Sequence, residues 1–433
     1  MNQSTSDDKS IQPQPSSLDL TRSRPGPVPV LRYGSPVESD ALKHGPRMYV
    51  AVVREPAKLI DYVPDWEHLA QHAIEPNLFY EHWFLLPAIE AFGSGVDLRI
   101  VFIFSSNPER PTGPPILSGM FPLEHSGSYL GLPASTLSFW KHPQCFLCTP
   151  LIRRAQAKET LQAFFAYLAS EAAGCSLAEL NFIPAEGPLY QVLTGVLHER
   201  TVSFFVFECF TRAVLQRAAD AATYLDATIS GRHRKELRRK EKRLSELGCL
   251  EYTTLDSDLD VDRWIESFLS LEASGWKGKD GGALKIKEVE RTFFQTVSRE
   301  AYRRGRLMML GVNLGGQPVA QKCNFLASDG AFAFKIGYDE RYSDFSPGVL
   351  LEIENIRRVH DSQTVLWMDS CAAPDHFMIN RLWTERRAIQ TIVIPTRKGW
   401  PEFLVSLMPL LRWLKRKLRV GDIAGTGKWS VFR

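Results

Sequence analysis

Residues 330–360, GAFAFKIGYDERYSDFSPGVLLEIENIRRVH, decide the expected fold of this chain. The apolar run 331–336 predicts a buried strand, and the polar residues after it predict a turn. Ser346-Pro347-Gly348 then opens an amphipathic helix, because Ser346 suits an N-cap and Pro347 suits the first helical position. Gly348 lets another molecule approach the backbone closely. The free N–H groups and the positive end of the helix dipole predict a phosphate site, whereas the plainer alternative is an ordinary strand-to-helix turn.

This segment resembles the pyrophosphate-binding strand, loop and helix of GNAT-type acyltransferases. More closely, it is similar to the branch associated with bacterial cellulose biosynthesis, through Lys335-Ile336-Gly337-Tyr338-Asp339 and Phe345-Ser346-Pro347-Gly348. Two upstream segments, the tryptophan-containing 271–278 and the basic run 232–243, match the same branch in order and approximate spacing. The resemblance covers roughly residues 225–395, and it implies a GNAT fold that uses an acyl-CoA donor.

The length of 433 residues favours two domains, and the 44% hydrophobic and 23% charged shares are typical of a soluble globular protein. A net charge of +3 gives no global field that would recruit nucleic acid or membrane. The N-terminus lacks the pattern of a signal peptide, and no apolar run is long enough to span a bilayer. We therefore expect a cytoplasmic protein.

The order of predicted elements divides the chain into four parts. Strands and helices alternate twice in similar order, with a helix predicted over 376–387 and a strand over 390–394 near the end. Three residue identities recur at a separation of 186, namely Pro188 with Pro374, Glu199 with Glu385 and Arg200 with Arg386. We therefore predict two fused copies of one mixed α/β fold. The resemblance implies that they are two tandem GNAT-like domains, each a mixed, mostly antiparallel sheet flanked by helices. The predicted parts are a disordered tail (1–46), an N-terminal domain (47–215), a C-terminal domain (216–399) and a terminal helix with a tail (400–433).

Only the second domain is expected to bind the donor. The position in the first domain that corresponds to the phosphate loop lies near Leu161, where no glycine opens the helix. The first domain is therefore expected to be a scaffold that helps to bind the acceptor. The resemblance implies that acetyl-CoA or another acyl-CoA is held by Phe345, Ser346, Pro347, Gly348 and Ile336. We expect no metal, because the Cys145/Cys148 pair has no second pair at useful spacing.

Acyl transfer to an amine requires a base, because a free lysine-like amine has a pKa near ~10.4 and is mostly charged at neutral pH. Our first choice is Asp369, at the expected C-terminal end of a strand, and the next are Asp339 and Glu340 on the loop before the helix. Tyr338 is the candidate acid for the leaving thiolate. The alternative for the three carboxylates is a solvated turn or cap residue, and for Tyr338 a packed aromatic ring.

Four residues are candidates for contact with the acceptor. Lys335 interrupts an apolar strand, so it should pair with substrate, phosphate or an acid. Trp276 is expected to border the acceptor groove, and Arg232 and Arg239 belong to a basic helix that would attract an anionic acceptor. The alternatives are an outward-facing strand lysine, a tryptophan that fills a domain interface and a solvated helix surface.

The leading interpretation is an acyl-CoA-dependent N-acyltransferase, an acetyltransferase that acts on an amine of a sugar or cell-envelope polysaccharide precursor. The first alternative is a Fem-like peptidyltransferase that uses aminoacyl-tRNA, although the basic run lacks the interleaved aromatic residues that stack on RNA bases. The second alternative is a degenerate GNAT-like binding partner of polysaccharide synthesis. Peripheral membrane contact through 403–418 competes with docking of that helix on the protein.

Overall fold

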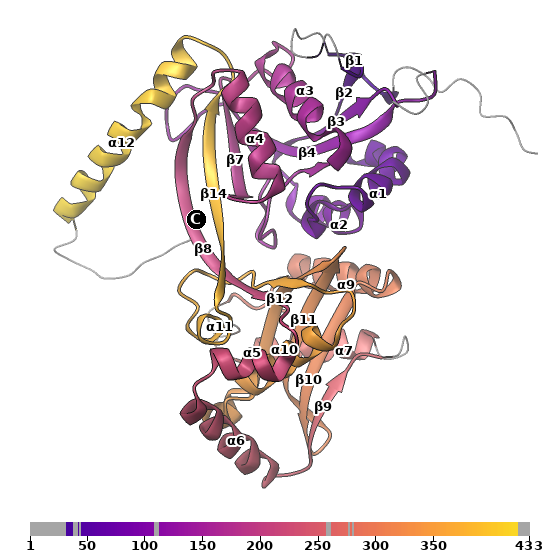
Figure 1. Cartoon of the computed structure of the whole chain (residues 1–433), viewed down its shortest axis with the longest axis vertical. Helices are drawn as coiled ribbons and strands as arrows, with labels where there is room; N and C mark the ends of the chain where they lie inside the picture. Colours follow the sequence, from indigo (N-terminus) through magenta and orange to yellow (C-terminus); the bar gives the residue numbers. More distant parts are fainter. Residues whose placement is uncertain are drawn as a thin grey trace, which may run out of the picture.

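The protein consists of two halves stacked end to end. A computed structural model describes residues 32–422, except 38–41, 43–44, 108–111, 257–260, 276–277 and 279–280. In Figure 1 the N-terminal half lies at the top and the C-terminal half at the bottom, and two long strands run between them.

The order of elements in the first half is a strand, two helices, three strands, a helix, a strand, a helix and a strand. These are β2 (Met48–Val53), α1 (Val63–Gln71), α2 (His82–Phe92), β3 (Asp97–Ser105), β4 (Ile116–Ser126), β5 (Thr136–Phe139), α3 (Ala157–Ala169), β7 (Leu177–Pro184), α4 (Pro188–Glu199) and β8 (Phe205–Gln216). Short elements are added by β1 (Ser35–Pro36), η3 (Pro56–Tyr62), η4 (Leu78–Tyr80), β6 (Leu151–Ile152) and η5 (Arg154–Gln156).

The second half repeats this order. It contains β9 (Leu250–Thr254), α7 (Val261–Ser274), α9 (Glu288–Arg303), β10 (Leu307–Leu314), β11 (Gln317–Ala327), β12 (Gly330–Tyr338), α10 (Pro347–Asp361), β13 (Trp367–Asp369), α11 (Phe377–Leu382) and β14 (Glu385–Pro395). It is preceded by α5 (Ala221–Thr228) and α6 (Gly231–Ser245), interrupted by η7 (Glu340–Phe345) and followed by α12 (Trp400–Asp422). The predicted mixed α/β fold of two tandem units is therefore confirmed.

The two halves exchange their last strands. The strand order is β1-β2-β3-β4-β5-β7-β14-β8-β13-β12-β11-β10-β9, so β14 lies beside β7 of the first half and β8 beside β13 of the second. Between them, β8 and β14 pair antiparallel from Glu385↔Val214 to Val393↔Phe205. The exchange joins both halves into one sheet, because each half completes its sheet with a strand from the other.

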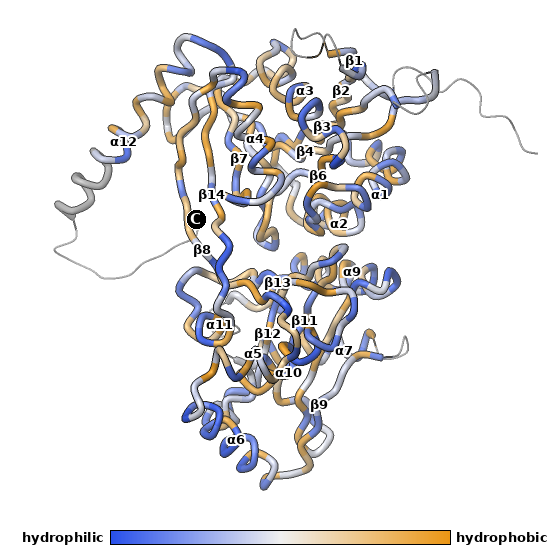
Figure 2. The backbone as a smooth tube through the Cα atoms, in the orientation of Figure 1, coloured by the Kyte–Doolittle hydropathy of each residue, from blue (hydrophilic) through white to orange (hydrophobic). Residues whose placement is uncertain are grey.

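Apolar faces of the strands and helices form the core between and within the halves. Figure 2 shows hydrophobic residues along the strands and a strongly hydrophilic α6 at the lower end of the molecule. Phe84 of α2 contacts Phe293, Phe325 and Phe334 of the second half with ring centroids 5.3, 5.9 and 6.2 Å apart. This aromatic contact fixes the first half against the sheet of the second half.

Three expectations about local structure are wrong. Ser35 and Pro36 pair with Val50 and Tyr49, so this part of the tail expected to be disordered is a strand, whereas residues 1–31 lie outside the described part. The helix expected over 376–387 ends at Leu382, because the chain enters β14 at Glu385. The constant separation of 186 has no structural meaning, since Glu199 ends a helix and Glu385 begins a strand.

Candidate functional site: a split between two parallel strands

The sheet of the second half opens between β12 and β13. These parallel strands pair only through Gly330↔Trp367, Ala331↔Met368 and Phe332↔Asp369. After this point Ser370 stays with β8, donating its N–H to Ala213 O at 3.1 Å, while β12 continues along β11 to Tyr338. The ladder between β12 and β13 therefore ends at Phe332.

A β-bulge lies where the strands separate. Phe332 pairs with Phe325 and Lys335 pairs with Cys323, so Ala333 and Phe334 together oppose the single residue Asn324. A bulge of this kind leaves a backbone group unpaired and bends the strand. Near the point where the strands separate, β12 therefore has a backbone group that is not hydrogen-bonded to β11.

The equivalent point in the first half is filled by large side chains. There β5 and β7 are parallel through Thr136↔Leu177 and its neighbours, so Phe139 and Leu180 occupy the positions of Ala333 and Ser370. Phe139 and Leu180 border a remaining cavity of only about 10 Å³ that also contacts α3 and α4. Small side chains at the separation point are thus a property of the second half, and sequence reasoning missed both residues.

The N-terminus of α10 presents a free amide at this end of the sheet. Pro347 has no N–H, and the buried Gly348 N–H has no acceptor among the described residues, whereas Val349 and Leu350 both donate to Ser346 O at 3.0 and 3.1 Å. Ser346 has left-handed backbone angles (φ 55°, ψ 51°) and makes no side-chain cap, so the expected N-cap through its hydroxyl is wrong. Instead, Lys240 Nζ of α6 donates to Ser346 Oγ at 2.9 Å.

The fold brings all three sequence segments of the predicted motif to this corner. From α6, Lys240 reaches Ser346, and the guanidinium of Arg243 lies 5.7 Å from the centre of the Phe345 ring. From α7, Glu272 lies so close to Gly337 that a Cβ there would stand 3.1 Å from the Glu272 backbone. The corner therefore combines a free helix amide, a lysine and the side of β12 that separates from β13, which together suit a phosphate and an extended chain attached to it.

The first candidate base, Asp369, is inside the protein rather than at the mouth of a site. Its carboxylate is fully buried and lies 2.7 Å from Arg212 Nε, and Arg212 Nη2 donates to it at 2.8 Å. Arg387 approaches the same carboxylate at 3.4 Å, and the Cys371 N–H donates to it at 2.9 Å. Burial alone would lower the pKa of Arg212, but the Asp369 carboxylate raises it above its usual value. This environment suits a structural ion pair and is unsuitable for a base that must reach a substrate amine.

Two other catalytic candidates lie at the end of β12. Asp339 accepts from the Arg341 N–H at 3.0 Å and pairs with the Arg341 side chain, whose hydrogen bonds lower the pKa of Asp339. It thus caps η7. Tyr338 is partly exposed and lies beside Gly348, where a Cβ on the glycine would stand 3.4 Å from the tyrosine ring. The position of Tyr338 fits a group at the edge of the donor site, whereas Asp339 is held by its cap.

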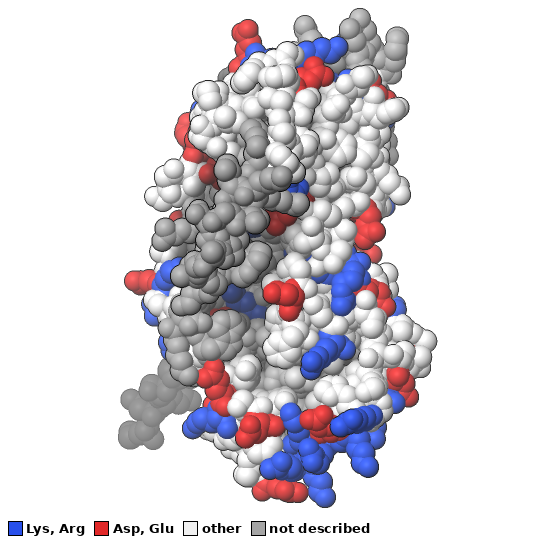
Figure 3. Space-filling view, turned by 90° about the vertical axis from the view of Figure 1, so that its left-hand side faces the viewer, with Lys and Arg blue, Asp and Glu red and all other residues white. Residues whose placement is uncertain are grey.

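The candidates for acceptor contact are dispersed. Lys335 is partly buried, with Nζ 5.8 Å from the centre of the Phe334 ring, and Trp276 lies outside the described residues. Arg232 and Arg239 are exposed on α6, and Figure 3 shows Lys and Arg side chains gathered at the end of the molecule where α6 lies. The structure does not bring these four residues into one site.

A cavity of about 570 Å³ lies between the halves, at the end of β13 where Trp367 begins the strand. It is bordered by Trp367 and Gln216 of the central strands, by Glu75 and Glu186 of the first half, and by Arg387. Glu75 accepts the Leu189 N–H at 3.0 Å and lies 3.5 Å from Arg387, while burial raises its pKa above the ordinary value. A carboxylate with a raised pKa in a cavity is suited to proton transfer, and sequence reasoning missed it because Glu75 is far from every motif.

Two further findings concern the described part of the chain. No group of three or more metal-ligating side chains occurs among the described residues. Within the same residues, no helix has the combined length and apolar character required to cross a bilayer.

The comparisons with known proteins agree with this geometry. Residues 231–377, from α6 to the first residue of α11, match the family model of an acetyltransferase (GNAT) domain. This region is therefore similar to a GNAT acetyltransferase domain, which supports an acyltransferase. No curated protein matches the sequence significantly.

Solved structures match this chain at low identity. A crystal structure of FemX matches with a TM-score of 0.50 and 10% identity over 76% of this chain and 95% of that chain. A conserved protein of unknown function from Bacteroides thetaiotaomicron VPI-5482 has a TM-score of 0.49 and 11% identity over 77% of this chain and 97% of that one. The likeness to FemX concerns the fold alone.

Proposed function

We propose that the chain transfers an acyl group from acyl-CoA to an amine, with the donor bound by the second half. The observation that carries this proposal is the contrast at the two strand separations. Ala333 and Ser370 stand in the second half where Phe139 and Leu180 stand in the first. The small side chains leave the second separation able to receive the narrow pantetheine chain, whereas apolar side chains fill the first.

The donor would lie along one continuous path. Its pyrophosphate would meet the Gly348 N–H at the α10 N-terminus and the Lys240 ammonium, with Phe345, Ser346 and Pro347 forming the loop around it. Its pantetheine would lie between the separated strands β12 and β13, past Ile336, toward the bulge at Ala333. The donor is expected to be acetyl-CoA or another acyl-CoA.

The chemistry follows from this placement. The amine must lose a proton before its nitrogen attacks the thioester carbonyl, and the new C–N bond then replaces the C–S bond. A backbone N–H released by the bulge is suited to stabilise the negative charge that develops on the carbonyl oxygen. Tyr338 would supply a proton to the departing thiolate.

The acceptor would enter through the cavity between the halves. Glu75, rather than the buried Asp369, is our candidate for the proton acceptor, because it borders this cavity and burial raises its pKa. The resemblance to the cellulose-associated branch suggests an amine on a sugar or cell-envelope polysaccharide precursor, which implies work in the cytoplasm. Lys335 and Trp276 stay candidates for contact with it, and Arg232 and Arg239 for attraction of an anionic acceptor.

Calorimetry with acetyl-CoA and longer acyl-CoAs tests the proposal. We expect binding by the parent protein, nearly unchanged binding by Gly348→Ala and loss of binding by Gly348→Glu, whose carboxylate would repel the pyrophosphate. A Cβ at Gly348 meets no atom closer than 3.4 Å, so the alanine variant is a matched control for folding. Binding of an aminoacyl-tRNA with no binding of any acyl-CoA would instead favour the Fem-like alternative, and binding of neither would favour a non-enzymatic partner.

A further inference from the structure

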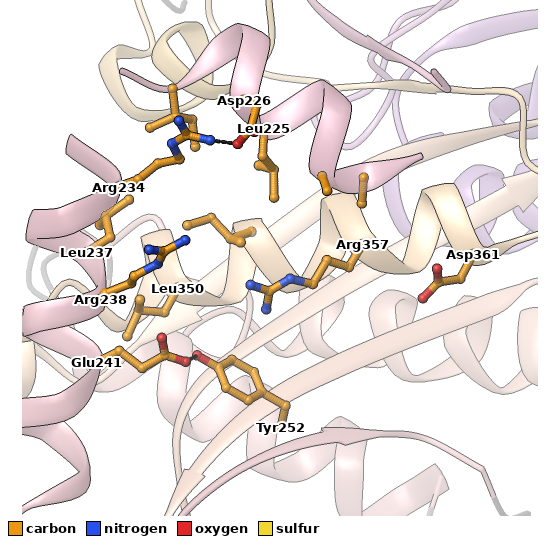
Figure 4. A pocket seen from close by; sticks show the side chains of 14 residues that line it. Leu225, Asp226, Arg234, Leu237, Arg238, Glu241, Tyr252, Leu350, Arg357 and Asp361 are labelled. Atoms are coloured by element: carbon orange, nitrogen blue, oxygen red, sulfur yellow. Dashed lines mark hydrogen bonds and ion pairs between the residues drawn. The ribbon is translucent and has the colours of Figure 1, made fainter. Parts of the chain in front are cut away.

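A hollow of about 390 Å³ lies between three helices next to the proposed donor site (Figure 4). Helix α10 forms its floor with Leu350, Ile353 and Arg357, while α5 and α6 form its walls. The apolar part of its lining comprises Ala221, Ala222, Leu225, Ile229, Leu237, Leu350 and Ile353. Its volume is within the range of small-molecule sites.

Two guanidinium groups enter this hollow from different helices. Figure 4 shows the side chains of Arg238 from α6 and Arg357 from α10 pointing toward one another across it. Among the described residues, Arg238 forms neither a hydrogen bond nor an ion pair, and Arg357 has a long contact of 3.3 Å with Glu354. Like charges that converge in this way are stabilised when an anion lies between them, and arginine binds phosphate through two parallel hydrogen bonds.

The other charged groups of the hollow are mostly engaged. Arg234 pairs with Asp226, and Glu241 accepts a hydrogen bond of 2.6 Å from Tyr252. Asp361 lies at the far end of α10, away from Arg238 in Figure 4. Besides apolar side chains and the two arginines, the part of the hollow near Leu350 contains the carboxylate of Glu241, which is held by Tyr252.

The hollow lies close to the N-terminus of α10. Leu350 lines it, donates its N–H to Ser346 O and lies two residues after Gly348 on the same helix. On α6, Lys240 bonds to Ser346 while the adjacent Glu241 lines the hollow. A ligand whose pyrophosphate lies at Gly348 can therefore extend its nucleotide end into this space.

We propose that the hollow binds the adenosine 3′-phosphate end of the donor, with Arg238 and Arg357 on the 3′-phosphate and the apolar floor under the adenine ring. This inference rests on the proposed use of acyl-CoA. Guanidinium groups also stack on flat nitrogenous rings, so the same two arginines suit both parts of the nucleotide. The consequence is that the protein should distinguish CoA from 3′-dephospho-CoA.

Calorimetric titration with CoA and with 3′-dephospho-CoA measures this preference directly. The intact protein should bind CoA at least about tenfold more tightly, a ratio that corresponds to ~1.4 kcal/mol. Arg238→Ala and Arg357→Ala should each bring the two affinities together, because only the binding of CoA loses a contact to the 3′-phosphate. Lys235→Ala is the matched control, because Lys235 is exposed on the same helix and is not part of the hollow, so it should keep the full preference.

The outcomes separate this inference from the proposed function. If the parent protein binds CoA and dephospho-CoA equally, or if Arg238→Ala and Arg357→Ala retain the preference, the hollow does not hold the 3′-phosphate, although acyl-CoA use stands. If neither compound binds, both proposals are overturned. Thermal unfolding of each variant shows whether lost binding reflects lost folding, and Arg238→Lys should then restore part of the preference by returning the charge.

Discussion

Arg212 and Asp369 form a fully buried ion pair that joins the two halves of the chain. Arg212 lies on β8, which ends the first half, and Asp369 ends β13 of the second half, with Nε and Oδ1 2.7 Å apart. A second guanidinium nitrogen of Arg212 donates to the Phe146 carbonyl at 2.6 Å. The ion pair thus connects β8 to β13 at the point where β12 and β13 separate.

Removing one partner of this pair should destabilise the protein strongly. Asp369→Asn leaves the Arg212 charge buried without its counter-ion, and breaking a buried pair typically costs ~3–5 kcal/mol. Urea unfolding followed by circular dichroism measures the loss. Asp339→Asn is the control, since Asp339 pairs with a largely exposed arginine and should change stability little. A variant Asp369→Asn with parental stability and no acyl transfer would restore Asp369 as the candidate base.

Copying the first half into the second should close the donor path. Ala333→Phe introduces the side chain that Phe139 contributes at the equivalent position, and it should abolish acyl-CoA binding measured by calorimetry. The reciprocal change Phe139→Ala should leave binding intact, although loss of a buried phenylalanine costs ~3–5 kcal/mol of stability. Unimpaired binding by folded Ala333→Phe would show that the pantetheine lies elsewhere.

Local sequence signals predicted the elements of this site well. The apolar run before Tyr338 and the Ser-Pro-Gly start of α10 are read from neighbouring residues, and both elements occur as expected. The basic run was also predicted as a helix, but its contact with Ser346 through Lys240 depends on how α6 packs. The spacing of charged residues in this run could have predicted the hollow. Arg234, Arg238 and Glu241 lie on the same face of the helix as the apolar Leu237.

The features that the sequence did not predict depend on contacts between residues far apart in the chain. Asp369 is paired with a residue 157 positions earlier, and nothing in the sequence around Asp369 reveals that Arg212 will face it. The end of α11 was missed for a similar reason, since residues 385–387 enter a strand because β8 offers Val214, Ala213 and Arg212 as ladder partners. Such tertiary pairing overrides local helix preference.

Lys240 should contribute to donor affinity. Lys240→Met keeps much of the aliphatic stem but removes the ammonium that bonds to Ser346 Oγ beside the α10 N-terminus. Hydrogen bonds to charged groups are worth ~1.5–3 kcal/mol, so we expect KM for acyl-CoA to rise by roughly ten- to a hundredfold with a smaller change in kcat. The comparison with Lys235→Met, on the exposed face of the same helix, separates this effect from a general loss of positive charge. Equal KM values for the two variants would remove Lys240 from the donor site.

Glu75 gives a prediction about pH. As a base it must be ionised, and burial raises its pKa above the ordinary carboxyl value, so the acidic limb of kcat/KM should lie at a higher pH than an exposed glutamate would give. Glu75→Gln should lower the rate by about 10²–10⁴-fold and remove that limb, while its amide oxygen can still accept the Leu189 N–H that begins α4.

The pH dependence of the free energy of unfolding tests the raised pKa of Glu75 independently. Because the folded-state pKa of Glu75 is raised, its contribution to stability is greatest below the unfolded-state pKa and is lost as the pH rises through the folded-state value. Urea midpoints of the parent protein should therefore fall relative to those of Glu75→Gln over this window. Glu186→Gln, at an exposed position of the same cavity, is the control for both measurements and should retain the parental limb and midpoints. An acidic limb that persists unchanged in Glu75→Gln would assign the proton transfer to another group.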